Sequence, residues 1–437
     1  MLQLEVRVSK TPELNARDIE RATHALSSGD RSGAERAYRA AAQGHLRHQV
    51  SWSNLAALGI ALGDAEGAFK HAQRSLELDQ RNSDAWVNFG VASWHLGRRR
   101  DAAQALHQAL QLSPGLEAAG INYAQMLRLI GRGTQAHDVL AVALLANPSS
   151  WRLQLAMAET ARVLERHDVA RSHVLIALGL MPIDGDRAVS NRSRGDRAAD
   201  GTQVRETLIA VGRLLRQANL PFHLIGGTLL ALHREGQPFP HDKDIDLGMP
   251  FDVDREAVYA AFATDYEPML RRADPNAVTS RKWVIGYTHR ATGIGVDLMF
   301  VQPRGDCMRF ELGWPDCLAS EVPAYGLETL MWEGIEWSIP SPPATYLVAV
   351  YGHDWNGTQN GAGYDRRYFD TQVSNPSRTP DSLPRAITLA LLRLVDALRA
   401  RDWAKADALA MQILAREYLP AVRRVRARLP QPVNAPA

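Results

Sequence analysis

The chain has 437 residues, 46% of them hydrophobic and 22% charged, and its 50 basic side chains nearly balance 48 acidic ones. This length leaves room for two or three domains with separate cores, and a formal charge of +2 gives no support for a nucleic-acid partner. No apolar run is long enough to span a bilayer, and no signal-peptide core opens the sequence. We therefore expect a cytoplasmic protein without a transmembrane segment. Peripheral attachment to the inner face of the membrane is a further option.

A period of 34 residues runs through residues 14–183. Glycine, alanine and proline each recur in fixed columns at this spacing. The columns are Gly29, Gly63, Gly97 and Gly131; Ala34, Ala68, Ala102, Ala136 and Ala170; and Pro114, Pro148 and Pro182. Agreement of independent columns on one period predicts about five copies of one structural unit, with the first and last copies degenerate, as end caps often are.

The clearest copy, AWVNFGVASWHLGRRRDAAQALHQALQLSP at residues 85–114, resembles the tetratricopeptide (TPR) repeat. In such a helical hairpin the glycine ends the first helix in a left-handed conformation and the proline ends the second helix. The small alanines let the two helices approach closely. The resemblance implies an all-α solenoid that presents a concave surface to a protein partner.

A polar linker at 184–202 follows the solenoid, and a second domain without the 34-residue period occupies 203–372. Its predicted elements in chain order are a helix at 203–220, a short strand that reaches Gly226 and Gly227, an acidic strand at 241–250, a helix at 251–265 and a strand at 293–301. This order of helices and strands predicts an α+β domain with a small mixed sheet.

The segment HDKDIDLGMP (241–250) contains three aspartates within five positions. Asp242, Asp244 and Asp246 alternate with other residues, so a strand would bring all three carboxylates to one face. Asp297 stands in an apolar strand, where a carboxylate is costly to bury unless a positive group compensates it. Carboxylates that converge from two strands form a hard, oxygen-rich site suited to Mg²⁺ or Mn²⁺, and the N–H groups of the Gly-Gly turn can approach phosphate oxygens.

Each of these features also has a plain structural explanation. A Gly-Gly pair is more often only a turn, and a single aspartate in a strand can cap a loop. An Asp-x-Asp run occurs in calcium loops too, although the glycine and glutamate spacing of an EF-hand is absent here. The order Gly-Gly, then Asp-Ile-Asp, then Val-Asp-Leu is more specific than any of its parts.

The segment GGTLLALHREGQPFPHDKDIDLGM (226–249) resembles the LicD/fukutin family of phosphoryl-alcohol transferases, within the nucleotidyltransferase superfold. The positions that match the family are Gly226, Gly227, Thr228, Arg234, Gly236, Pro240, Asp242, Asp244 and Asp246, with Asp297 as the later strand aspartate. A downstream signature is matched by Tyr346, Leu347, Tyr351, Gly352 and Trp355. The sequence departs from the family at His241, where a Trp is common.

The resemblance implies that Asp244 and Asp246 ligate metal ions, with Asp297 as a third ligand or as the base that orients the acceptor hydroxyl. Asp242 would ligate a second metal ion or form a salt bridge with Lys243 or Arg234.

Donor phosphates would be held by Gly226, Gly227 and Thr228. Arg234 is a candidate phosphate clamp because its planar fork binds two oxygens at once, and pairing with the acidic strand is an equal alternative. Lys282 could reach a phosphate, although an ordinary surface charge explains it as well.

The implied activity is transfer of a phosphorylated alcohol, such as phosphocholine or ribitol phosphate, from a CDP-linked donor to a glycan hydroxyl, while the TPR repeats recruit a protein partner. One alternative is a nucleotidyltransferase that moves the nucleotide itself to a hydroxyl. Another is a non-catalytic TPR adaptor with a decayed transferase domain, and retention of the carboxylates and of the Gly-Gly turn argues against it.

The C-terminal region is not covered by either resemblance. Residues 384–425 are predicted to form a helical extension, with two helices over 384–419, and 426–437 a disordered tail. Cys307 and Cys317 are predicted to be two buried thiols, with one disulfide as the alternative.

Overall fold

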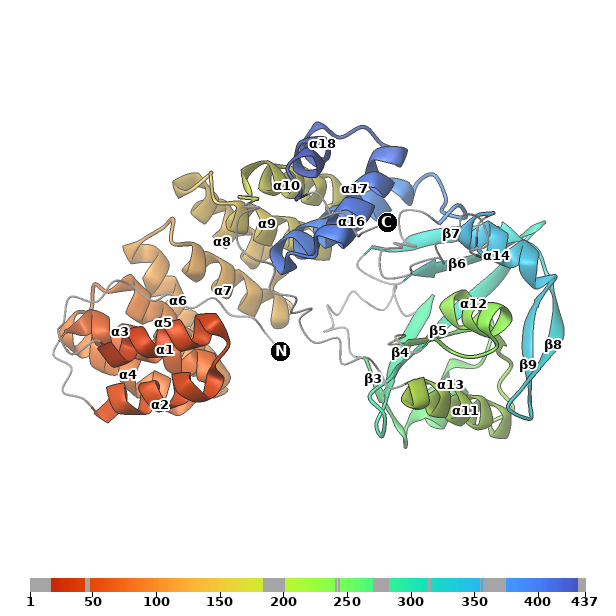
Figure 1. The fold of residues 1–437 in the computed structure, drawn as a ribbon, viewed down its shortest axis with the longest axis horizontal. Coiled ribbons are helices and arrows are strands. Elements are labelled where there is room, and N and C mark those ends of the chain that lie inside the picture. Colours follow the sequence, from red (N-terminus) through yellow and green to blue (C-terminus); the bar gives the residue numbers. More distant parts are fainter. Residues whose placement is uncertain are drawn as a thin grey trace, which may run out of the picture. The chain divides into compact units, whose positions relative to one another are not determined.

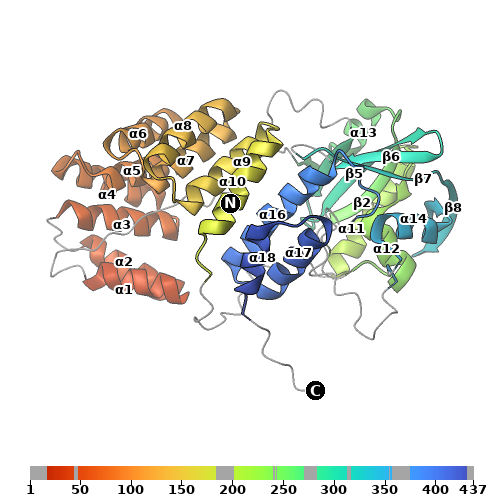
Figure 2. The ribbon, with the colours of Figure 1, turned by 90° about the horizontal axis from the view of Figure 1, so that it is seen from above.

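The computed structural model describes residues 17–43, 48–183, 201–239, 242, 244–269, 283–312, 316–353, 355–356 and 375–430. The chain divides into two compact units, Met1–Leu180 and Met181–Ala437. Across these described ranges, no helix is both long enough and apolar enough to cross a membrane. The fold is shown in Figures 1 and 2.

The N-terminal unit is built from helical hairpins, which Figure 2 shows side by side. Its helices are α1 (Arg17–Ser28), α2 (Arg31–Gln43), α3 (Gln49–Leu62), α4 (Ala65–Leu78), α5 (Ser83–His95), α6 (Arg99–Leu112), α7 (Glu117–Leu129), α8 (Gly133–Ala146), α9 (Trp151–Val163) and α10 (His167–Leu180). Each odd-numbered helix packs against the next one in the chain, and odd-numbered helices of neighbouring hairpins also touch. This arrangement confirms the predicted all-α repeat region.

The turn inside each hairpin explains the glycine column. Gly29, Gly63, Gly97 and Gly131 all have φ between 76° and 90°, a left-handed conformation that favours glycine. After Gly97, the N–H of Arg98 donates to the carbonyl of Ser93 (2.8 Å), a bond of the kind that closes a Schellman motif. The fifth hairpin makes the same turn with a non-glycine residue at φ 58°.

Two further columns lie between the helices. Every alanine of the 34-residue column from Ala34 to Ala170 is 0% exposed, so a larger side chain there would force the paired helices apart. Asparagines at the same period, which the sequence reading did not single out, are also buried. Asn88 is one of them, and its Nδ2 donates to the carbonyl of Ser53 on the preceding hairpin (3.0 Å).

The C-terminal unit contains a mixed sheet, as predicted. Its strands are β1 (His223–Leu224), β2 (Asp244–Pro250), β3 (Tyr266–Pro268), β4 (Val284–His289), β5 (Gly295–Arg304), β6 (Cys307–Leu312) and β7 (Leu318–Pro323). The order is β1-β2-β5-β4-β3, and the far end of β5 pairs with β6, which pairs with β7. Strands β2 and β5 are parallel and the other neighbours are antiparallel.

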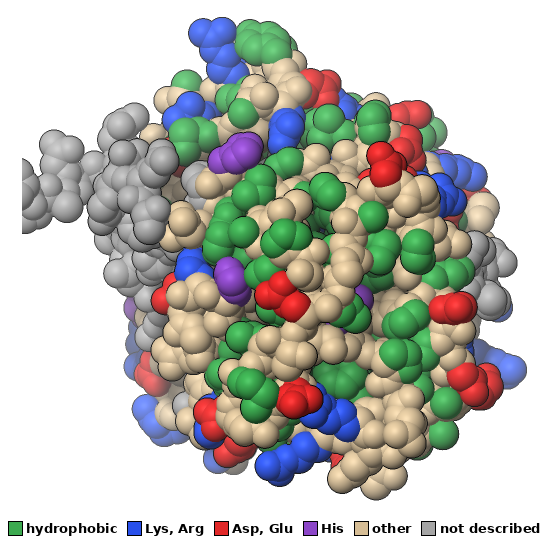
Figure 3. Space-filling model, turned by 90° about the vertical axis from the view of Figure 1, so that its right-hand side faces the viewer, with side chains coloured by type: hydrophobic (Ala, Val, Ile, Leu, Met, Phe, Trp, Pro, Cys, Tyr) green, Lys and Arg blue, Asp and Glu red, His purple; other side chains and the backbone are tan. Residues whose placement is uncertain are grey.

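Helices and a two-stranded ribbon pack around this sheet. They are α11 (Gly201–Gln217), α12 (Gly226–Glu235), α13 (Arg255–Phe262), α14 (Pro343–Tyr351), β8 (Gly326–Trp332) and β9 (Ile335–Ser341). Helix α12 packs against β2 and against α14, which places the start of α12 beside the acidic strand. Figure 3 shows the face of the molecule on which the β8–β9 hairpin lies, where hydrophobic side chains are interspersed with charged ones. Leu327 and Met331 of β8 are exposed.

The C-terminal extension has three helices rather than the two predicted. They are α16 (Leu383–Ala400), α17 (Trp403–Arg416) and α18 (Pro420–Ala427). The α16–α17 turn has the geometry of the repeat hairpins, because Arg401 has φ 58° and the Asp402 N–H donates to the Ala397 carbonyl (2.9 Å). The segment before α16 is tied to β7, where Ser382 Oγ accepts from the Ala319 N–H (2.9 Å). A Pro at the start of α18 allows this further helix to begin.

The two cysteines are free, so the structure contains no disulfide between them. Cys307 and Cys317 are both half-buried, whereas the sequence led us to expect fully buried thiols. Cys307 is the first residue of β6, and its thiol lies 3.1 Å from the Arg304 carbonyl.

Candidate active site

The Gly-Gly pair forms the start of a helix. Strand β1 ends at Leu224 and α12 begins at Gly226, which has φ +54°. A Cβ at Gly226 would lie 2.5 Å from Asp246 Oδ2, so the position requires glycine both for its backbone conformation and for the approach of this carboxylate. The predicted turn is therefore also the point where α12 meets the acidic strand.

The amides of this helix start have acceptors within the protein. Gly227 N–H donates to Asp246 Oδ2 (2.8 Å), and Gly226 N–H donates to Tyr346 Oη (3.3 Å). Thr228 Oγ1 accepts from the Asp246 N–H (2.8 Å). Asp246 is thus held through its backbone and through its carboxylate by consecutive residues of α12. A phosphate at this helix start would have to share or replace these contacts.

Strand register brings the predicted aspartates together. Asp246 of β2 is paired with Asp297 of the parallel strand β5, and Asp244 is paired with Gly295. Paired residues of neighbouring strands point to the same side of a sheet, and Asp244 and Asp246 share a face because side chains alternate. Asp242 precedes β2 rather than belonging to it, and its N–H donates to the Phe239 carbonyl (3.1 Å).

The electrostatics show that these carboxylates act on one another. Burial raises the pKa of Asp246 well above its usual range, and repulsion from Asp244 and Asp297 raises it further. Asp242 contributes in the same direction, whereas the hydrogen bond from Gly227 N–H lowers this pKa. Asp244 and Asp297 therefore lie close enough to Asp246 to act on its carboxylate.

Strand β4 leaves space for the third carboxylate. Gly286 is paired with Asp297, and a Cβ there would lie 2.9 Å from Asp297 Oδ1. The sequence reading did not identify Gly286 as part of the site. A glycine in a strand signals close approach of another group, but only the register shows which group it is.

The donor chemistry fits a divalent cation, since these side chains offer hard carboxylate oxygens whose mutual repulsion a cation would relieve. Among the residues that the structure describes, no group of three or more His, Cys, Asp or Glu side chains is arranged to hold a metal ion by protein ligands alone. Mg²⁺ is commonly bound by one or two carboxylates together with substrate phosphates and waters. A pair of these aspartates, completed by the substrate, is the arrangement that fits.

Two basic residues were predicted near the phosphates. Arg234 donates from Nε to Glu235 Oε1 (2.6 Å) and from Nη1 to the Trp355 carbonyl (3.2 Å), and its guanidinium lies 5.0 Å from the centre of the Phe239 ring. These contacts fix the end of α12. Lys282 lies outside the described residues, as do Pro240, His241 and Lys243.

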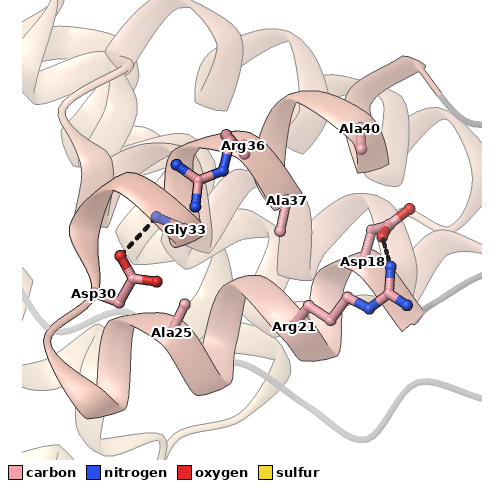
Figure 4. A pocket seen from close by; sticks show the side chains of 8 residues that line it. All are labelled: Asp18, Arg21, Ala25, Asp30, Gly33, Arg36, Ala37 and Ala40. Atoms are coloured by element: carbon pink, nitrogen blue, oxygen red, sulfur yellow. Dashed lines mark hydrogen bonds and ion pairs between the residues drawn. The ribbon is translucent and has the colours of Figure 1, made fainter.

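A pocket in the N-terminal unit lies on a different part of the chain. It has a volume of about 400 Å³ and is lined by Asp18, Arg21, Ala25, Asp30, Gly33, Arg36, Ala37 and Ala40. Figure 4 shows that α1 and α2 form it, with alanines between the charged groups. Arg21 pairs with Asp18 (3.1 Å) and Asp30 Oδ1 accepts from the Gly33 N–H (2.8 Å), so these groups stabilise the hairpin itself.

Comparisons with solved structures concern the helical repeats. TTC0263, a thermophilic TPR protein of Thermus thermophilus, is 18% identical, with 39% of this chain and 94% of that chain covered and a TM-score of 0.35. PilF of Pseudomonas aeruginosa is 20% identical (46% and 90% covered, TM-score 0.33), and MamA is 17% identical (39% and 95% covered, TM-score 0.31). The TPR-like assignment rests on the repeat columns and the turn geometry, not on these values.

No curated protein matches the chain. A protein family does match residues 219–340, namely the nucleotidyltransferase domain of LicD/FKTN/FKRP. The matched range contains the start of α12 and the strands that carry the aspartates. It confirms the resemblance that the Gly-Gly and aspartate motifs indicated. The chain therefore contains a LicD-family nucleotidyltransferase domain, preceded by TPR-like helical repeats.

Proposed function

We propose that the chain is a metal-dependent transferase that moves a phosphorylated alcohol from a CDP-linked donor to a hydroxyl of a glycan. The observation that carries this proposal is the pairing of Asp246 with Asp297, with Asp244 on the same face and the glycine start of α12 bonded to Asp246. A carboxylate cluster beside a glycine-rich helix start is suited to a nucleotide diphosphate with its cation. Membership of the domain in the LicD family supports a transferase.

The chemistry that we propose is a substitution at phosphorus. The acceptor hydroxyl oxygen forms a bond to the phosphorus that carries the alcohol, the bond from that phosphorus to the bridging oxygen breaks, and CMP leaves. The proton of the hydroxyl passes to Asp297, which lies beside Asp246 on the neighbouring strand. A bound Mg²⁺ or Mn²⁺, held by Asp244 and Asp246, supplies charge neutralisation at the donor phosphates.

The residues of α12 have the task of holding the donor. Gly226 and Gly227 have no Cβ, so phosphate oxygens can come close to the backbone of this helix start, where the Gly227 N–H can donate to them and the Thr228 hydroxyl lies nearby. The N-terminal end of a helix also favours negative charge, which adds to the attraction. Asp297 keeps its position because Gly286 leaves room for its carboxylate.

The helical repeats have a separate role in this proposal. TPR-like solenoids expose extended surfaces formed by successive hairpins, and such surfaces commonly bind proteins. We propose that the N-terminal unit recruits a protein partner to the transferase.

The test combines binding and turnover. Calorimetric titration with CDP-choline or CDP-ribitol in the presence of Mg²⁺ should show binding, and Asp244→Asn should weaken it and abolish turnover. Asp252→Asn is the matched control, because Asp252 is exposed just beyond the end of β2 and should leave both unchanged. Absence of binding by the unaltered chain, or full turnover by Asp244→Asn, would contradict the proposal.

The products decide which phosphorus is attacked. Release of CMP with a phospho-alcohol on the acceptor supports the proposal. An acceptor that carries the nucleotide would instead show nucleotidyl transfer, the alternative that the same superfold allows.

A further inference from the structure

Tyr346 contacts the helix start from a distant part of the chain. It lies on α14, and it is 3% exposed. Its Oη accepts the hydrogen bond from the Gly226 N–H at 3.3 Å. Gly226 is the residue whose φ of +54° sets the direction in which α12 begins, so this bond acts on the backbone that orients the Gly-Gly pair.

The hydrogen bond to Tyr346 gives the first N–H group of α12 an acceptor. The first N–H groups of a helix have no partner within the helix, and a buried N–H without an acceptor is destabilising. Ile225, the residue that precedes α12, provides no side-chain cap. Gly227 N–H is satisfied by Asp246 and Gly226 N–H by Tyr346, so two different elements share the task of capping α12.

The Tyr346 ring is held by a second buried tyrosine. Tyr325 packs edge-to-face against it, with 5.7 Å between ring centres and an interplanar angle of 89°. Tyr325 Oη lies 2.8 Å from Nε2 of His223 on β1. A Cβ at Gly248 would lie 2.5 Å from the same Nε2, so the imidazole fills the space over β2. The Tyr325 ring therefore fixes where the Tyr346 hydroxyl points, whereas the Tyr325 hydroxyl contacts His223.

Burial also keeps both hydroxyl groups protonated. Removal from water raises the pKa of Tyr346 and of Tyr325 far above neutral pH. A neutral phenol can accept from the Gly226 N–H without placing a negative charge beside Asp246. The arrangement is thus compatible with a phosphate or a cation arriving at the same helix start.

We propose that Tyr346 is a positioning residue of the transferase site. Its hydroxyl fixes Gly226, and through Gly226 it orients the Gly227 N–H and the Asp246 carboxylate, which face the donor. This inference deepens the proposed function and rests on it for the identity of the ligand. Tyr346 itself makes no contact with reacting atoms in this scheme. It acts through the backbone of Gly226.

The experiment compares the full chain with Tyr346→Phe and Tyr325→Phe. Each substitution removes one buried hydroxyl and keeps the ring, but only Tyr346→Phe removes the acceptor of the Gly226 N–H. Hydrogen exchange with residue-level fragmentation reports on this N–H directly, and calorimetry with CDP and Mg²⁺ reports on the site.

We expect the Gly226 N–H to be protected in the unaltered chain and to exchange about tenfold faster in Tyr346→Phe, since one hydrogen bond corresponds to roughly a two- to tenfold effect. The dissociation constant for CDP with Mg²⁺ should rise by a factor of about three to ten in Tyr346→Phe. Tyr325→Phe should lower the melting temperature to a similar extent and change neither quantity.

The two proposals can fail separately. If the unaltered chain does not bind CDP with Mg²⁺, the proposed function fails, and the exchange of Gly226 still decides whether Tyr346 fixes the turn. If the chain binds CDP and Tyr346→Phe binds it equally well, the positioning role is wrong and the transferase proposal stands. Equal weakening by Tyr325→Phe would show a general loss of stability instead. Rapid exchange of the Gly226 N–H in the unaltered chain would overturn the inference even if Tyr346→Phe does not fold.

Discussion

The buried imidazole of His223 makes the stability of the C-terminal unit depend on pH. His223 lies on β1 with its Nε2 against Tyr325 Oη, and burial lowers its pKa from 6.5 to about 4. Below pH 6.5 the unfolded chain takes up a proton that the folded chain does not bind until about pH 4. The folded state therefore loses stability as the pH falls through this window and keeps it fully above the window.

The size of the effect follows from the difference between the two pKa values. A shift from 6.5 to about 4 corresponds to roughly 3 kcal/mol at about 1.4 kcal/mol per pKa unit. The group is buried, so solvent screening takes little from this value. A loss of this size is a substantial fraction of the free energy of unfolding of an ordinary domain.

Because the chain has two units, hydrogen exchange of segments is a better assay than a single melting curve. The opening free energy is obtained from exchange of peptides over β1 and β2, corrected for the intrinsic rate. Between pH 6.5 and 4.5 it should fall in the unaltered chain relative to His223→Gln, and protonation of Asp246 acts in the opposite direction in both proteins. His223→Gln keeps a hydrogen-bonding group and removes the titration, so its slope over this range should lack the His223 contribution. Parallel slopes in the two proteins would refute the assignment of this effect to His223.

Three more outcomes are expected. Gly212→Ala should lower the free energy of unfolding of the C-terminal unit by about 1–2 kcal/mol. A Cβ at Gly212 would lie 2.4 Å from Trp337, and this overpacking outweighs the gain in helix propensity. The midpoint of denaturant unfolding measures the change. Asp246→Asn should raise the stability of the metal-free protein at pH 7, because a carboxylate whose pKa is raised by folding disfavours the folded state when charged. That gain should shrink as the pH falls and Asp246 itself takes up a proton, and exchange at β2 against pH tests both parts. Gly97→Ala should destabilise the repeat region by about 1–2 kcal/mol through backbone strain alone, since nothing lies within 4 Å of the added Cβ. Glu165→Gly at the equivalent turn should stabilise the same region. The melting temperatures of the two variants should therefore shift in opposite directions.

The repeat region was predictable because its structure is set by local spacing. A left-handed turn at Gly63 and a buried alanine at Ala68 depend on neighbours within one hairpin, and these recur at every 34 residues. The third helix of the C-terminal extension was missed because eight residues give little more than two turns in which an amphipathic pattern can be recognised. Its buried valines, Val422 and Val425, become meaningful only against α17.

The candidate site was predictable in its residue types and not in its connections. The motifs identified Asp244, Asp246 and Asp297, but the pairing of Asp246 with Asp297 depends on strand register, which the sequence does not encode locally. The bond from Gly226 to Tyr346 joins residues 120 positions apart. Tyr346 was matched to the family signature and was given no role, because its partner Gly226 is distant in the sequence.

At the start of α12, Asp246 and a donor phosphate would compete for the same backbone N–H group, that of Gly227. In the structure the Gly227 N–H donates to Asp246, whereas in the proposed function it donates to a donor phosphate. A cation that draws the Asp246 carboxylate away would release this N–H for the phosphate, and the phosphate would in turn supply ligands to the cation. Binding of the two should therefore be mutually favourable, and thermodynamic linkage requires the factor to be the same in both directions. Calorimetric titrations of Mg²⁺ with and without CDP, and of CDP with and without Mg²⁺, measure that factor. Independent binding would mean that Asp246 keeps its bond to Gly227 throughout, and that the phosphate is held elsewhere.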